Sequence, residues 1–181
     1  MTVRVLIALT LLALLLPAEA RAWTWPVSGE VVTRYRNGPD PYAGGQHRGI
    51  DIAAPAGAAV VAGRAGTVVF AGSLGGAGLT VSVRTSDGRF DTSYLHLGST
   101  AVARGAAVSE GDPIGTVGTS GRMTVGEPHL HFGVRTAGTR HDYHDPLALL
   151  PPRAAREPRA PRAVPRPAGP RRDSRRPAPG R

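Results

Sequence analysis

The sequence contains no cysteine, so neither a disulfide nor a thiolate ligand is available in any of its 181 residues. A folded domain without disulfides depends on its hydrophobic core, with or without the help of a metal ion. Any metal site in this chain must therefore take its ligands from histidine, aspartate and glutamate.

Helical periodicity is missing as well, because no segment after residue 22 keeps it for more than about two turns. Short β-prone runs separated by glycine-rich links take its place, at residues 30–35, 60–62, 66–71, 79–84, 90–97, 112–117 and 129–136. The Asp87-Gly88 pair between two of these runs is the strongest hairpin signal. The sequence predicts an all-β domain of short antiparallel hairpins.

Residues 151–181 lack aromatic residues, leucine, isoleucine and methionine, and hold ten arginines and nine prolines against one glutamate and one aspartate. Such a segment cannot bury enough apolar surface to offset the entropy lost on ordering. We therefore expect a disordered basic tail after a folded domain at residues 23–150.

The folded domain has no net charge. Of the formal charge of +9, residues 151–181 carry +8 and residues 1–22 carry +1, so residues 23–150 are neutral. A nucleic-acid-binding domain would carry a basic patch on its folded face, so we expect no nucleic-acid partner. The tail would instead attract anionic wall polymers or a membrane surface; a solubilising tail without a partner is the alternative.

Residues 1–22 have the pattern of a secretory signal peptide. A positive charge precedes an apolar run at 5–16 that only Thr10 interrupts, and small residues follow in an A-x-A pattern. We expect cleavage after Ala22, or else after Ala20, and a secreted protein. Retention as a membrane anchor is the alternative, although the run is shorter than the roughly 18 residues that a spanning helix needs.

Two histidines one residue apart stand in the apolar run Pro128-His-Leu-His-Phe132. In a strand, His129 and His131 point to one face while Leu130 and Phe132 point to the other. Two imidazoles on one face can share a cation, but a zinc site needs at least three protein ligands.

Further ligand types occur upstream. His47 and Asp51 are four residues apart, which in an extended segment places them on one face, and Gly49 between them leaves room for a close approach. Histidine and carboxylate ligands with one open position match a catalytic zinc site. His96 is a candidate for acid–base work, and the run 90–97 would place Tyr94 on the same face.

The combination of His47-x-x-x-Asp51, Tyr94-x-His96-Leu97 and His129-x-His131 resembles the M23 family of zinc metallopeptidases, the lysostaphin or LytM type, over residues 25–135. The resemblance implies a twisted antiparallel sheet crossed by a substrate groove. It implies one zinc ion held by His47, Asp51 and His131. His96 and His129 would then be the catalytic base and the oxyanion stabiliser.

The implied activity is hydrolysis of amide bonds in peptidoglycan peptides by a monomeric enzyme associated with the cell wall. The glycine-rich segments 38–45 and 72–78 would form walls of the groove. One alternative is a non-catalytic module that binds peptidoglycan or activates an amidase, although such relatives usually lose a metal ligand and all five positions are filled here. Another is a secreted metal-binding or wall-anchoring protein whose active element is the basic tail.

Three further residues need an interpretation. The family often has Thr-Gly-Pro before its histidine pair, whereas this chain has Gly126-Glu-Pro128, and we expect Glu127 to be a solvated loop residue. His141 and His144 follow the last predicted strand with a spacing of three, and we expect them in a surface loop without a metal.

Overall fold

The computed structural model describes residues 23–123 and 126–153. The predicted signal peptide and nearly all of the predicted tail lie outside these residues. Within them the chain forms eleven strands and two short 3-10 turns, η1 (Gly75–Ala77) and η2 (Pro146–Ala148), and no α-helix. None of the described residues forms a helix long and apolar enough to cross a membrane. The prediction of an all-β fold is confirmed.

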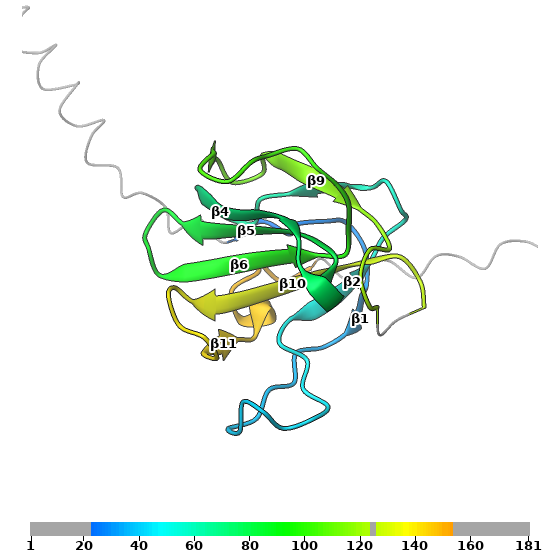
Figure 1. Cartoon of the computed structure of the whole chain (residues 1–181), viewed down its shortest axis with the longest axis vertical. Coiled ribbons are helices and arrows are strands. Elements are labelled where there is room, and N and C mark those ends of the chain that lie inside the picture. Colours follow the sequence, from blue (N-terminus) through cyan, green and yellow to red (C-terminus); the bar gives the residue numbers. More distant parts are fainter. Residues whose placement is uncertain (1–22, 124–125, 154–181) are drawn as a thin grey trace, which may run out of the picture. The chain divides into compact units, whose positions relative to one another are not determined.

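Eight strands form one antiparallel sheet (Figure 1). Its order is β1 (Val31–Thr33), β2 (Ile50–Ala53), β10 (His129–Thr136), β6 (Phe90–Leu95), β5 (Leu79–Thr85), β4 (Gly66–Ser73) and β8 (Ala107–Val108), with β11 (Tyr143–His144) also paired to β10. A second antiparallel sheet has the order β3 (Ala59–Val61), β9 (Pro113–Val117) and β7 (Leu97–Thr100).

The hairpin between β5 and β6 forms where the Asp87-Gly88 pair predicted it. Gly88 has a φ of 70°, in the left-handed region that glycine occupies without steric cost. The Asp87 carboxylate accepts hydrogen bonds from the Arg89 backbone N–H at 3.0 Å and from the Thr85 hydroxyl at 2.6 Å. The turn therefore depends on contacts within a few residues, which explains why the sequence could predict it.

One hydrophobic core joins both sheets and reaches the two ends of the described domain. Leu130 and Phe132 of β10 are fully buried, as the alternation of that strand predicted. Trp23 packs edge-to-face on Phe132 with ring centroids 6.4 Å apart, and Leu150 also belongs to the core.

The structure differs from the sequence analysis at His96. The run 90–97 was expected to form one strand, but it is divided into β6 and β7, which belong to different sheets. The break occurs because His96 has a φ of 63°, which ends the extended conformation. The expectation that Tyr94 and His96 share a face is therefore wrong: Tyr94 is fully buried, and its hydroxyl accepts a hydrogen bond from the Gly63 N–H at 2.8 Å.

Candidate metal centre and active site

The pairing of β2 with β10 brings together residues that are 80 positions apart. Asp51 of β2 lies directly opposite His131 of β10, and Ala53 lies opposite His129. Because side chains alternate along each strand, Asp51, His129 and His131 all project from the same face of the sheet. The register thus places a carboxylate between two imidazoles.

Three ligand atoms converge at this point. The Oδ1 atom of Asp51 lies 3.0 Å from Nε2 of His47 and 2.9 Å from Nδ1 of His131, and these two nitrogens are 3.0 Å apart. They form the one group within the described residues whose donor atoms are close enough to hold a metal ion.

The donor set fits zinc. Two imidazole nitrogens and one carboxylate oxygen are ligands of catalytic zinc sites. Bonds of about 2.0 to 2.2 Å in a tetrahedron imply ligand atoms roughly 3.3 to 3.6 Å apart, only slightly more than the separations here. The other carboxylate oxygen of Asp51, Oδ2, is buried without a hydrogen-bond partner.

The electrostatics of these three residues also favour a cation. Burial alone would raise the pKa of the Asp51 carboxyl, but hydrogen bonds to His131 and His47 outweigh burial and hold that pKa well below its usual range. Burial would lower the pKa of His47, but the hydrogen bond to Asp51 raises it above its usual value. The carboxylate is therefore fixed as an anion beside two nitrogen donors.

A backbone carbonyl orients the first of these candidate ligands. The Nδ1–H of His47 donates to the backbone carbonyl of Arg34 at 2.9 Å, so in the neutral ring Nε2, the atom facing Asp51, carries the lone pair. Gly49 allows the close approach that the sequence analysis expected. A Cβ atom at this position would lie 2.4 Å from the Phe132 carbonyl oxygen and 2.7 Å from Nε2 of His131.

His129 faces the same group without belonging to it. Its Nδ1–H donates to the backbone carbonyl of Glu127 at 2.8 Å. Its Nε2 is buried, lacks a hydrogen-bond partner and lies 3.9 Å from Oδ1 of Asp51. An unpartnered buried acceptor is costly, and here it lies near the Asp51 oxygen of the three-atom group.

His96 has a similar arrangement on a strained backbone. Its Nδ1–H donates to the Ser120 carbonyl at 2.9 Å, and its ring centroid is 5.1 Å from that of His129. Burial lowers its pKa, against the effect of the hydrogen bond to Ser120. A non-glycine residue at φ 63° costs about 1 to 3 kcal/mol, and such strain is concentrated at functional sites.

The other histidines lie elsewhere. His144 is held by the Thr136 hydroxyl, with Nε2 and Oγ1 2.7 Å apart, and the ring of His141 packs edge-to-face on Tyr42 at 5.4 Å. Neither belongs to a metal-binding group within the described residues. The side chain of Glu127 is exposed, as expected, and only its backbone carbonyl contacts the site.

Sequence reasoning missed the groups that orient the histidines. The carbonyls of Arg34, Glu127 and Ser120 each accept a hydrogen bond from an imidazole Nδ1–H. Every residue has a carbonyl, so the sequence carries no signal for this role.

Residues 45–143, more than half of the chain, match the sequence profile of Peptidase family M23. The chain belongs to this family. The M23 prediction is confirmed, and because M23 peptidases depend on zinc, the group formed by His47, Asp51 and His131 is a candidate zinc site in this chain.

Relatives of this M23 chain include a lipoprotein and a peptidase. The uncharacterized lipoprotein YgeR of Escherichia coli (strain K12) is 35% identical over 141 residues, which cover 77% of this chain and 51% of that protein. DD-carboxypeptidase/endopeptidase Mpg of Neisseria meningitidis serogroup B is 41% identical over 104 residues, 58% of this chain and 23% of that protein. This chain therefore spans about half the length of the first relative and about a quarter of the second.

The solved catalytic domain of the antimicrobial peptidase lysostaphin from Staphylococcus simulans has the same fold as this M23 chain. The TM-score is 0.56 at 31% sequence identity, and the match covers 66% of this chain and 88% of that domain. The lysostaphin-like fold predicted for the M23 chain is thereby confirmed.

Proposed function

We propose that this M23 chain is a zinc-dependent endopeptidase that hydrolyses amide bonds in peptidoglycan peptides. The observation that carries the proposal is the convergence of His47, Asp51 and His131, whose ligand atoms all lie within 4.8 Å of one another. Two histidines that are not needed as ligands stand beside them, which is the composition of a catalytic site with an open position.

In this proposal, Nε2 of His47, Oδ1 of Asp51 and Nδ1 of His131 hold the zinc ion. Zinc in such a site supplies Lewis-acid polarisation and makes water acidic enough to yield hydroxide near neutral pH. The carbonyl of Arg34 keeps His47 in the tautomer that leaves Nε2 available.

His96 and His129 handle the proton. Each donates its Nδ1–H to a carbonyl, so the Nε2 of each neutral ring is an acceptor. His129 accepts the proton of the water that attacks the carbonyl carbon, because its buried Nε2 has no other partner. Once protonated, such a ring can donate to the carbonyl oxygen or to the amine nitrogen that leaves when the C–N bond breaks. His96 is the second candidate for accepting this proton, because its Nε2 is an acceptor in the same tautomer.

The substrate class rests on the relatives. Mpg is named a DD-carboxypeptidase/endopeptidase and the lysostaphin domain is named an antimicrobial peptidase, and peptidoglycan peptides fit both names. The loop around η1 contributes to a substrate groove in our proposal, because its Ala77 carbonyl accepts the backbone N–H of His96 at 3.2 Å. Loop 38–45, which leads into His47, would form the opposite wall.

The proposal includes the organisation of the chain. Residues 1–22 act as a secretory signal, residues 23–150 form the peptidase domain, and the arginine-rich segment that follows associates with anionic envelope polymers. A location in the cell envelope agrees with the lipoprotein relative YgeR.

Two alanine variants test the division of roles between the histidines of β10. His131→Ala should lose stoichiometric zinc because it removes a ligand, whereas His129→Ala should keep zinc and lose turnover by about a hundredfold or more. Zinc content is measured by elemental analysis, and hydrolysis by mass spectrometry of defined cross-linked muropeptides.

His144→Ala is the matched control, because His144 stands outside the ligand group and should retain both zinc and turnover. A zinc-loaded chain that releases no new peptide ends would contradict the peptidase proposal and favour a non-catalytic peptidoglycan-binding or amidase-activating module.

A further inference from the structure

The loop after β9, residues 118–122, packs tightly against the loop around η1. Gly78 and Gly121 have φ values of 69° and 79°. A Cβ atom on Gly78 would lie 2.4 Å from the carbonyl carbon of Ser120, and one on Gly121 would lie 2.4 Å from the backbone nitrogen of Gly78. The two loops touch through their backbones, so the conformation of one restricts the other.

Ser120 connects these two loops to the strands β5 and β7 and to His96. Its hydroxyl accepts a hydrogen bond from the N–H of Leu79, the first residue of β5, at 2.8 Å and donates to the carbonyl of Leu97, the first residue of β7, at 2.8 Å. Its carbonyl accepts the Nδ1–H of His96 at 2.9 Å. The hydroxyl therefore holds the peptide group that orients the imidazole.

The backbone of His96 depends on the same two loops. Its N–H donates to the Ala77 carbonyl of the η1 loop at 3.2 Å, and its carbonyl accepts the Gly118 N–H of the other loop at 3.0 Å. At φ 63° His96 stands outside both strands, so these loop contacts fix where its ring points.

We propose that Ser120 is a positioning residue for His96. The serine hydroxyl fixes the loop so that its carbonyl holds the proton of His96 on Nδ1, which leaves Nε2 as a free acceptor beside His129. This inference rests on the proposed role of His96 in proton handling. Ser120 itself touches neither the metal ligands nor His129 in any described contact.

The test compares Ser120→Ala with a matched control, Ser99→Ala, in the zinc-loaded full-length chain. Ser99 forms the same kind of contact, a hydroxyl hydrogen bond of 2.8 Å to Thr116 between β7 and β9, but none to His96. Nitrogen-15 NMR of the labelled imidazoles reports the tautomer of His96 in each variant, without substrate. Zinc content, kcat and KM are measured alongside.

We expect Ser120→Ala to keep one equivalent of zinc, to lose the uniform Nδ1–H tautomer of His96 and to reduce kcat about ten- to a hundredfold with little change in KM. Ser99→Ala should keep the wild-type tautomer and kcat. An unchanged His96 tautomer in Ser120→Ala would overturn the inference, and so would a loss of zinc, which would place the effect at the metal ligands.

The outcome is separable from that of the proposed function. If the wild-type chain hydrolyses no muropeptide, the endopeptidase proposal fails, while the imidazole spectra of wild type and Ser120→Ala still decide whether Ser120 orients His96. If the wild type is active and the spectra are identical, the positioning role alone is wrong.

Discussion

At the scale of single residues, the candidate metal centre depends on the absence of a side chain at one position as much as on the candidate ligands. Imidazole and carboxylate groups converge within hydrogen-bonding distance of one another only because the chain at Gly49 passes against β10 without a side chain. A difference of about one ångström in distance also distinguishes the two histidines of β10. Nδ1 of His131 lies 2.9 Å from Oδ1 of Asp51, whereas Nε2 of His129 lies 3.9 Å from the same oxygen and has no hydrogen-bond partner.

Gly49→Ala tests the importance of this space. The new methyl group would overlap the Phe132 carbonyl and the ring of His131, so β2 and the ligand ring must both move. We expect a loss of stability of about 1 to 3 kcal/mol together with weaker zinc binding, measured by thermal unfolding and by zinc titration.

Gly44→Ala is the control, because a Cβ atom at Gly44 would meet no atom within 4 Å. Both variants exchange glycine for alanine, so a similar loss of zinc affinity in the two would show that the fit at Gly49 is unimportant.

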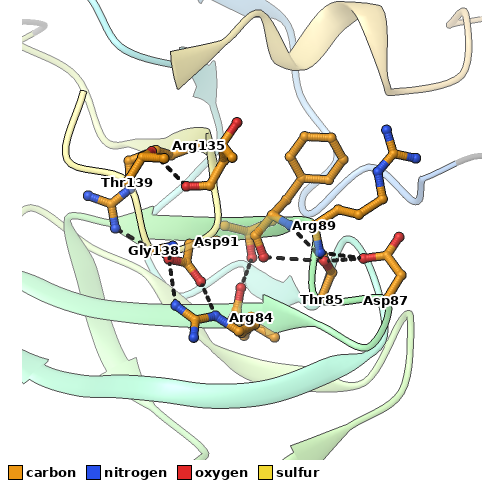
Figure 2. Close-up of polar contacts among 12 residues, drawn as sticks. Arg84, Thr85, Asp87, Arg89, Asp91, Arg135, Gly138 and Thr139 are labelled. Carbon is orange, nitrogen blue, oxygen red and sulfur yellow. Dashed lines mark hydrogen bonds and ion pairs between the residues drawn. The ribbon is translucent and has the colours of Figure 1, made fainter. Parts of the chain in front are cut away.

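At the scale of elements, the far end of the sheet is held by a charged network around Asp91 of β6 (Figure 2). Its carboxylate pairs with Arg84 of β5 at 2.9 Å and with Arg135 of β10 at 3.5 Å, and it accepts the Gly138 N–H at 3.2 Å. One buried carboxylate on β6 thus ties together β5, β6 and β10, three neighbouring strands of the sheet, and β10 carries the two histidines.

The network makes a prediction about pH. Burial alone would raise the pKa of Asp91, but the hydrogen bonds from Arg84 and Gly138 outweigh it and hold the pKa below its usual value. A lowered folded-state pKa means that the stabilisation is complete above the unfolded pKa, about 3.9, and is lost as pH falls through the folded value.

Asp91→Asn should therefore be less stable than wild type by about 1 to 3 kcal/mol at pH 7, and the difference should shrink as the pH falls below about 4. Urea unfolding at a series of pH values measures both. Asp142→Asn, at a side chain that is 59% exposed, should show no such difference. A gap between wild type and Asp91→Asn that stays constant down to pH 2 would contradict this account.

Elements also mark where sequence reasoning reached its limit. The hairpin at Asp87-Gly88 was predictable because its hydrogen bonds close within five residues. The division of residues 90–97 into two strands was not predictable. The contacts that hold His96 at positive φ come from Ala77 and Gly118, and no local sequence pattern connects these residues to His96.

At the scale of the whole molecule, our proposal gives the neutral domain and the basic tail different functions. The described core reaches from Trp23 to Leu150, and all five candidate site residues lie between these positions. The net positive charge of the chain lies almost entirely after residue 150. Chemistry would then belong to the domain, and attraction to an anionic surface to the tail.

Deletion of residues 154–181 should separate catalysis by the domain from surface attraction by the tail. We expect unchanged zinc content and unchanged hydrolysis of small soluble muropeptides, but weaker retention on isolated cell walls, with a difference that disappears at high salt because screening removes long-range attraction. Cosedimentation with walls at low and high ionic strength measures this. Equal retention of both forms at low salt would show that the tail has no such role.

The sequence by itself determined the fold class, the family and the set of candidate residues, because alternation, turn chemistry and motif spacing are local properties that can be read along the chain. The tertiary structure decided how those residues are arranged. The β2–β10 register sets Asp51 against His131, the loop contacts set His96 outside its strand, and the distances distinguish His131 from His129. These features arise from hydrogen bonds between segments up to about 80 residues apart, and the free energy of such contacts has no counterpart in any short stretch of sequence.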